Sequence, residues 1–138
     1  MTADSETPRS RYWSAAPYFI VDDVVASAHY YRDTLGFQFT QFWGEPPCFT
    51  IVRRNGASIM LSQPEEKGHM RPNSTVDPEQ TIWDAYLWID DADALYAEYQ
   101  QKGVTITQPI CNQPYGCREF TIRDCNGYTL GLGQDLQS

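Results

Sequence analysis

The chain has 138 residues, enough for one compact domain with its own core, and its apolar fraction of 41% argues against a disordered protein. A net charge of −8 argues against a nucleic-acid partner, because phosphate binding needs clustered Lys and Arg. No apolar run approaches the roughly 20 residues that cross a bilayer, and the polar start of the chain shows no apolar core of a secretory signal, so we expect a cytoplasmic protein without a membrane partner.

One stretch of the sequence occurs twice. FTIVRRNGASIMLSQ at residues 49–63 aligns without a gap on FTIRDCNGYTLGLGQ at residues 120–134. The segment before it is repeated as well, since residues 21–39 resemble residues 89–106. Such a repeat predicts two similar units, neither of which can bury both faces of its sheet alone.

In the first half, an Asp-Asp pair at residues 22–23 precedes an amphipathic segment. This pattern predicts a helix over 24–34 with an aspartate as its N-cap. Gly36 follows, where a helix end favours a left-handed residue. The hairpin-turn dipeptide Asn55-Gly56 then predicts two strands, at 47–54 and 57–63.

The second half repeats these signals after a polar segment. We interpret residues 64–81 as a linker, either a plain crossover or a functional loop. A strand is predicted over 82–89, and a helix over 92–102 follows the second Asp-Asp pair. Asn126-Gly127 predicts another hairpin, with strands at 116–124 and 127–134.

Each half is therefore predicted to be a βαβββ module, and the chain to have an α+β fold. The two modules should pack side by side about a pseudo-twofold axis and enclose a cleft between their sheets. The predicted organisation is one domain with four parts: an N-terminal tail at 1–13, a first module at 14–63, a linker at 64–81 and a second module at 82–138.

Strand alternation predicts that three candidate side chains share one face of the 82–89 strand, the face that in the family named below carries a metal-ligand position and so is expected to line the cleft. Asp84, Tyr86 and Trp88 share one face, and a carboxylate beside two aromatic rings suits a flat or cationic ligand. The alternative is that both rings fill the core between the modules.

The two repeated strands that follow the Asn-Gly turns differ on the same face. Met60 and Ser62 in the first copy are replaced by Gly131 and Gly133 in the second. Glycine clears space where a ligand approaches closely, and it also accommodates a bend or a bulge. Both explanations fit the sequence, and we include Met60, Ser62 and Gly131 in the candidate ligand site.

Three more residues are candidates for ligand binding. Glu119 alternates onto the cleft face, although a solvated pair with Arg118 is the alternative. Trp43 and Tyr115 lie where strands meet loops and favour a binding lip or a dimer contact. No nucleophile has a histidine within plausible reach, so no catalytic residue is assigned, and the four cysteines are expected to be free thiols.

The repeat resembles a known family. The patterns DxxxSxxYYxxxLGF, at residues 23–37, and NGxxLxLGQ, at residues 126–134, resemble the vicinal oxygen chelate superfamily, which includes glyoxalase I, extradiol dioxygenases and bleomycin resistance proteins. The REF at 118–120 and the final GQ resemble the bleomycin resistance branch most. This resemblance implies a homodimer with ligand clefts at the subunit interface and stoichiometric capture of a drug.

The resemblance also implies four positions where metal-using relatives carry ligands. In this sequence they are Ala16, Met60, Asp84 and Gly131. Ala and Gly have no donor atom, a Met thioether is soft, and one carboxylate cannot replace three or more protein ligands. We therefore expect no metal site and no cofactor.

The leading hypothesis is a non-catalytic protein that sequesters a bleomycin-type or other cationic or aromatic small molecule. An acidic protein attracts such cations. One alternative is a glyoxalase- or dioxygenase-like enzyme, either metal-independent through Asp84 or Glu119, or metal-dependent with a non-standard site. Another is a structural module whose cleft is filled by its own side chains.

Overall fold

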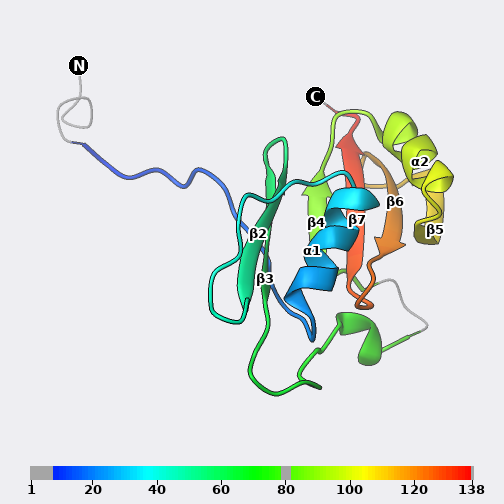
Figure 1. Cartoon of the computed structure of the whole chain (residues 1–138). Helices are drawn as coiled ribbons and strands as arrows, with labels where there is room; N and C mark the ends of the chain where they lie inside the picture. Colours follow the sequence, from blue (N-terminus) through cyan, green and yellow to red (C-terminus); the bar gives the residue numbers. More distant parts are fainter. Residues whose placement is uncertain (1–7, 79–81, 138) are drawn as a thin grey trace.

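The computed structural model describes residues 8–78 and 82–137. Residues 1–7 of the predicted tail, residues 79–81 of the predicted linker and Ser138 lie outside the described part. Within it, two helices and seven strands form an α+β fold with two sheets, which confirms the predicted fold class (Figure 1). No helix in the described ranges is long and apolar enough to cross a membrane.

The first sheet has the order β1-β3-β2. β1 pairs in parallel with β3, and β2 and β3 form the predicted hairpin, with Asn55 in a left-handed conformation at φ 52°. The segment between the helix and β2 pairs with β2 only through the bridges Gln38 to Arg53 and Trp43 to Phe49. The elements of this half are β1 (Tyr18–Ile20), α1 (Val24–Asp33), β2 (Phe49–Arg54) and β3 (Ala57–Ser62).

The second sheet has the order β4-β7-β6-β5, with β4 parallel to β7 as β1 is to β3. Its fourth strand, β5, corresponds in the first half only to the two isolated bridges, so among the described residues the prediction of a βαβββ module is wrong for the first half. β4 is shorter than the predicted strand over 82–89. A short 3-10 helix, η2, lies in the predicted linker. The elements of this half are η2 (Asn73–Thr75), β4 (Ala85–Trp88), α2 (Ala92–Gln101), β5 (Thr105–Asn112), β6 (Cys117–Arg123) and β7 (Thr129–Asp135).

The hydrophobic core lies on the face of the two sheets that was predicted to pack under the helices. Ile59, Leu61, Leu130 and Leu132 are all buried there. α1 packs against β2 and β3, and α2 packs against β5, β6 and β7. The opposite face of the sheets is therefore the one available for a site.

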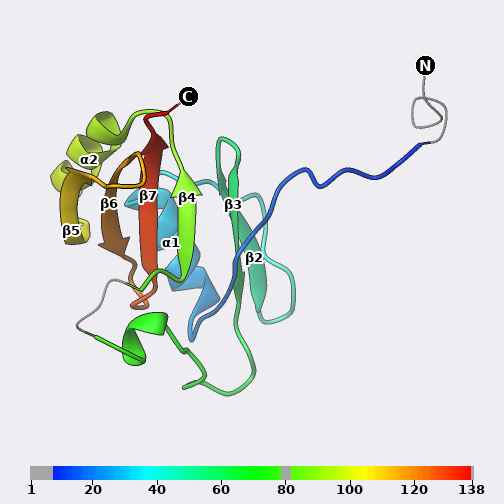
Figure 2. The ribbon, with the colours of Figure 1, turned by 180° about the vertical axis from the view of Figure 1, so that it is seen from behind.

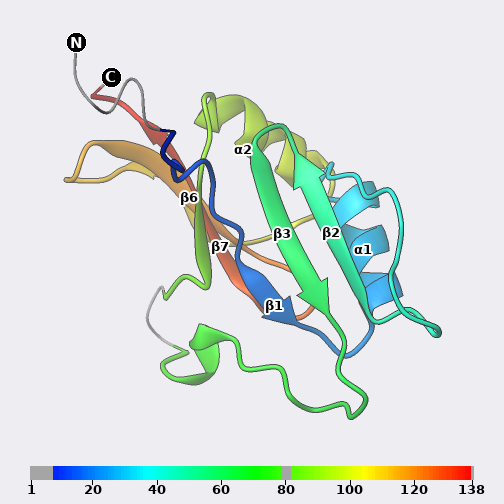
Figure 3. The ribbon, with the colours of Figure 1, turned by 90° about the vertical axis from the view of Figure 1, so that its left-hand side faces the viewer.

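The two halves are joined by polar contacts as well as by the core. Tyr31 of α1 donates a 2.6 Å hydrogen bond to the Asp124 carboxylate at the end of β6. The β2–β3 turn lies beside α2, where Arg54 forms a two-pronged ion pair with Glu98 at 2.8 and 2.9 Å (Figure 3). These contacts come from elements far apart in the chain, so they define how the modules sit together.

Residues 8–15 form an extended arm that leaves the body at β1 and runs away from both sheets (Figures 1 and 2). Tyr12 and Trp13 on this arm are almost fully exposed, at 108% and 97%. The described part of the predicted tail, residues 8–13, and residues 14–15 of the predicted first module thus form one extended segment.

Candidate functional site

Three aromatic rings form a row along β4. Trp83, which is separated from the strand by Asp84, packs edge-on against Tyr86 with ring centroids 4.7 Å apart, and Tyr86 packs edge-on against Trp88 at 5.0 Å. Trp88 remains 65% exposed. Aromatic rings prefer such edge-on contacts, and an exposed ring at the end of the row offers a stacking surface.

The glycines of β7 make room for this row. A Cβ atom on Gly131 would lie 2.6 Å from Cδ2 of Tyr86 and 2.8 Å from Nε1 of Trp83. A Cβ atom on Gly133 would collide with the Tyr86 hydroxyl. The space that the glycines clear is therefore filled by the protein's own rings, and neither a ligand nor a bend is needed to explain it.

Glu119 on β6 is fully buried and is held by four neutral side chains. Tyr115 and Tyr86 donate hydrogen bonds of 2.6 and 2.9 Å to Oε1. Gln113 and Gln108 donate longer ones, of 3.2 and 3.4 Å, to Oε2. We call this group, Glu119 with its four donors, the Glu119 cluster.

Both tyrosines of the cluster stay protonated at neutral pH. Burial raises the pKa of Tyr86 well above its usual value, and the hydrogen bond to Glu119 raises it further. Burial and the same carboxylate raise the pKa of Tyr115. Each hydroxyl therefore acts as a hydrogen-bond donor to Glu119 in the cluster.

The alternative interpretation of Glu119, a solvated pair with Arg118, is wrong, because Glu119 is buried. Arg118 points to the other side of the sheet, where it pairs with Asp93 of α2 at 3.0 Å and bonds Asn112. Neighbouring residues of a strand face opposite sides, so the two charges are separated by the sheet itself.

Asp84 lies apart from the Glu119 cluster. One of its carboxylate oxygens accepts a 2.8 Å hydrogen bond from the backbone N–H of Thr129, and the other accepts one of 2.8 Å from that of Asn73. It lines a small hollow of about 300 Å³ together with Tyr18, His69 and Arg71. Its carboxylate thus ties the linker to β7.

The candidates of the first module lie on the corresponding face of the first sheet. Met60 and Ser62 are half-buried on β3 and pair with Tyr18 and Ile20 of β1. Trp43 is exposed beside Phe49, with ring centroids 5.8 Å apart. Within one chain these residues and the Glu119 cluster lie on two separate sheets.

A cavity of about 740 Å³ lies between the two halves. It runs along β4, including Tyr86 and Trp88, and is bounded by α2 and by the β2–β3 turn. Apolar side chains dominate it, with Asp90, Asp91, Arg54 and Glu98 among the polar lining. Its volume falls in the usual range for small-molecule pockets.

The four positions that correspond to metal ligands in relatives carry Ala16, Met60, Asp84 and Gly131. Asp84 is the one hard donor of this set, and its two oxygens are already hydrogen-bonded. In the described residues, no three His, Cys, Asp or Glu side chains lie together as a metal-ion group. These four positions do not fit a hard metal ion.

Sequence reasoning missed three residues of the site. Trp83 was missed because alternation along the predicted 82–89 strand assigned it to the opposite face, whereas β4 begins only at Ala85. Gln108 and Gln113 were overlooked, although β5 pairs with β6 and Gln108 stands opposite Thr121. The polar side chains along β5 and directly after it were the signal that could have indicated Gln108 and Gln113.

Solved structures with the same fold include both binding proteins and an enzyme. The bleomycin-binding protein of Streptomyces verticillus, solved with copper(II)-bleomycin, has a TM-score of 0.64 at 24% identity, with 94% of this chain and 100% of that chain covered. TnmS3, an antibiotic binding protein from Streptomyces sp. CB03234, has a TM-score of 0.64 at 26% identity, with 91% and 99% covered. A lactoylglutathione lyase from Agrobacterium tumefaciens has a TM-score of 0.65 at 17% identity, with 91% and 96% covered.

Among curated proteins, no sequence matches the chain. One family model matches residues 15–132, from the end of the arm to β7. This match spans both halves and every element of the two sheets. The chain belongs to the Glyoxalase/Bleomycin resistance protein/Dioxygenase superfamily.

Proposed function

We propose that the protein binds a cationic or aromatic small molecule of the bleomycin type without converting it. The observation that carries this proposal is the Glu119 cluster, a fully buried carboxylate whose four donors are neutral. A buried charge is costly unless an opposite charge compensates it. A cationic group of a ligand would supply that charge.

The aromatic rings beside the cluster suit the same ligand. Tyr86 and Trp88 form part of the row on β4, and the Tyr115 ring is 53% exposed while its hydroxyl reaches Glu119. A cation over a ring face gains roughly 0.5–2 kcal/mol, and a flat ligand gains stacking area. The net charge of −8 would further attract a cation.

We also infer a homodimer in which the first sheet of one chain faces the second sheet of the other. Tyr18, Ile20 and Trp43 expose large apolar side chains on the first sheet, as Trp88 and Tyr115 do on the second. Facing sheets would bring Met60, Ser62 and Trp43 of one chain over the Glu119 cluster of its partner. The candidate residues of both modules would then belong to one cleft.

The test is a tryptophan-fluorescence titration with metal-free bleomycin, a cationic probe, at low and moderate salt. We expect saturable quenching near one ligand per chain, an affinity that falls as salt rises, and a ligand that mass spectrometry recovers unchanged. Glu119→Gln should weaken binding by roughly tenfold or more, because it removes the buried charge. Glu65→Gln, at an exposed position of the linker, is the matched control.

Other results would contradict the proposal. If the Glu119→Gln variant binds with the same affinity as the unchanged chain, the Glu119 cluster is excluded as the ligand site. If only Asp84→Asn weakens binding, the cation is recognised in the small hollow that Asp84 lines. A chemically altered ligand would identify an enzyme. No response to bleomycin or to a panel of cationic aromatic dyes would overturn capture of this ligand class.

A further inference from the structure

The two Asn-Gly turns are copies of one another in the sequence, but the structure gives them different surroundings. The first, Asn55-Gly56, is the tip of the β2–β3 hairpin (Figure 3). The second, Asn126-Gly127, lies between β6 and β7. Asn is a chemically labile residue, and a following Gly makes it more so, because no side chain hinders attack by the Gly backbone nitrogen.

The reaction open to such a pair is deamidation, which needs no reactant other than water. The Gly nitrogen forms a bond to Cγ of the Asn, the Cγ–Nδ2 bond breaks, and ammonia leaves with the proton of the attacking N–H. Water then opens the cyclic imide at one carbonyl to give aspartate, or at the other to give isoaspartate, in which the main chain runs through the former side chain. Both the Gly N–H and the Asn amide must therefore be free to approach one another.

Both groups are free at the first turn. Asn55 and Gly56 are exposed, and nothing lies within 4 Å of a Cβ atom placed on Gly56. Within the described part of the chain, no hydrogen bond holds the Gly56 N–H or the Asn55 side-chain amide. The turn closes on the pairing of Arg54 with Ala57, at the end of the hairpin. Loosening it to let the nitrogen reach Cγ thus breaks few contacts.

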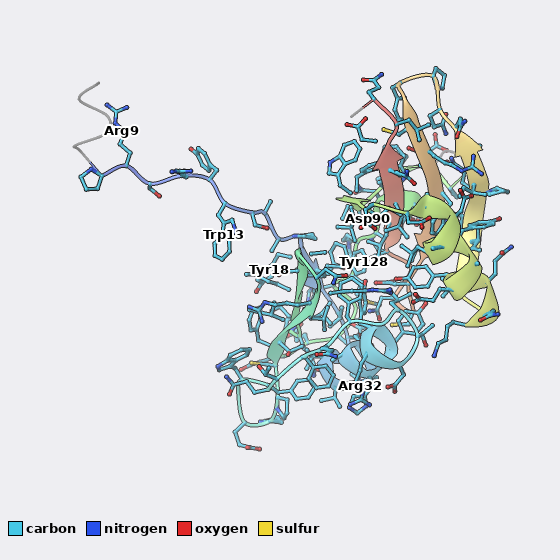
Figure 4. The ribbon with its side chains drawn as sticks, turned by 90° about the horizontal axis from the view of Figure 1, so that it is seen from above. Arg9, Trp13, Tyr18, Arg32, Asp90 and Tyr128 are labelled. Atoms are coloured by element: carbon cyan, nitrogen blue, oxygen red, sulfur yellow. The ribbon has the colours of Figure 1, made fainter. Side chains whose placement is uncertain are left out.

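Both groups are held at the second turn. The Gly127 N–H donates a 3.1 Å hydrogen bond to the carbonyl of Asp124, and the Asn126 amide donates one of 3.0 Å to the Ser27 hydroxyl of α1. The Asp124 carboxylate also accepts hydrogen bonds of 2.8 and 2.9 Å from the backbone N–H groups of Asn126 and Tyr128. Tyr128 is buried, and Figure 4 shows it in the body of the molecule. Ring closure here has to break these bonds first.

We propose that Asn55 is a site of spontaneous deamidation in the folded protein, whereas its copy Asn126 is protected. The modification acts on the joint between the two halves. Residue 55 lines the 740 Å³ cavity and follows Arg54, whose guanidinium pairs with Glu98 of α2 at 2.8 and 2.9 Å. Aspartate places a second carboxylate next to Arg54, and isoaspartate lengthens the main chain of a turn that sets Arg54 opposite Ala57. Either product weakens the Arg54–Glu98 pair.

The first test follows both turns in one sample. The full chain is incubated in mildly alkaline buffer, with and without urea, and peptides from each turn are assayed by mass spectrometry over time. Without urea, Asn55 should deamidate roughly tenfold or more faster than Asn126. In urea the two rates should converge, because both residues precede Gly. A folded chain in which Asn126 reacts as fast as Asn55, or in which Asn55 persists while the unfolded chain reacts, would overturn the proposal.

The second test addresses the reason for the protection. Ser27→Ala removes the hydroxyl that holds the Asn126 amide, so deamidation of Asn126 should become several-fold faster while that of Asn55 stays the same. Ser14→Ala, which truncates a hydroxyl on the exposed arm, is the matched control and should change neither rate. If Ser27→Ala leaves the Asn126 rate unchanged, the assigned protection is wrong.

The third test measures the effect on the joint. The deamidated chain is more acidic, so ion exchange separates it from the fresh chain, and urea denaturation compares the two. We expect the deamidated chain to unfold at a lower urea concentration. Asn55→Gly has no amide to lose and suits the left-handed turn position, so its midpoint should not change on incubation. Equal midpoints of the deamidated and fresh chains would contradict an effect on the joint, and none of these readings depends on the proposed ligand.

Discussion

At the scale of single residues, the Tyr86 side chain connects the features of the site. Its ring packs between Trp83 and Trp88, its hydroxyl donates to Glu119, and its volume occupies the room left by Gly131 and Gly133. A glycine in a strand normally weakens it, since it has no side chain to pack. Here the missing side chains let one tyrosine reach a buried carboxylate.

Gly131→Ala should lower the free energy of unfolding by about 1–3 kcal/mol, because the added methyl overlaps Tyr86 and Trp83. Urea denaturation measures the change. Gly56→Ala is the control, since nothing lies within 4 Å of a Cβ atom there. Equal stability of the two variants would show that the rings move aside at no cost.

At the scale of secondary structure, the two halves use the same helix start. In each Asp-Asp pair the second aspartate is the N-cap, Asp23 for α1 and Asp91 for α2, and each accepts a 3.0 Å hydrogen bond from a backbone N–H three residues on. Each helix is followed by a left-handed glycine, Gly36 at φ 81° and Gly103 at φ 72°. Both features were predicted from the repeat, because caps depend on neighbours in the sequence.

Asp91→Ala should therefore destabilise the protein by about 1 kcal/mol, whereas Asp90→Ala should change it by less than about 0.5 kcal/mol. The lost hydrogen bond to Ala94 is the reason for the difference. Thermal or urea unfolding followed by circular dichroism would check it. A larger effect of Asp90→Ala would mean that the first aspartate of the pair caps the helix.

At the scale of the whole molecule, the halves are joined by pairs of side chains that no local pattern indicates. Tyr31 reaches Asp124, and Arg54 reaches Glu98. Burial raises the pKa of Asp124, although the hydrogen bond from Tyr31 opposes that shift. The hydrogen bond from Arg54 lowers the pKa of Glu98.

The Arg54–Glu98 pair predicts a pH dependence. Because the pKa of Glu98 is lower in the folded chain, its contribution to stability is present above the unfolded value of about 4.3 and is lost as the pH falls through the folded value. The difference in free energy of unfolding between the unchanged chain and Glu98→Gln should thus be largest near neutral pH and shrink in acid. Urea denaturation at several pH values measures it, with Glu65→Gln as the control. A difference that is independent of pH would contradict the ion pair.

The sequence by itself determined the α+β fold class, the helix caps, the hairpin turns and the apolar face under the helices. Each of these features depends on residues a few positions apart, and each local signal occurs in both copies of the repeat. Tyr86, Trp88 and Glu119 also came from strand alternation, and Tyr115 came from its position where a strand meets a loop. Their assignment as ligand-binding residues stays a prediction.

Only the tertiary structure decided how those side chains are used. Glu119 is buried under Tyr86 and Tyr115 instead of pairing with Arg118, and Asp84 binds backbone N–H groups of Thr129 and Asn73. The partners come from other strands and from the linker, so their distances depend on sheet register and on the packing of the two halves. A buried carboxylate accepts whichever donors that packing brings within reach, and no spacing along the chain encodes them.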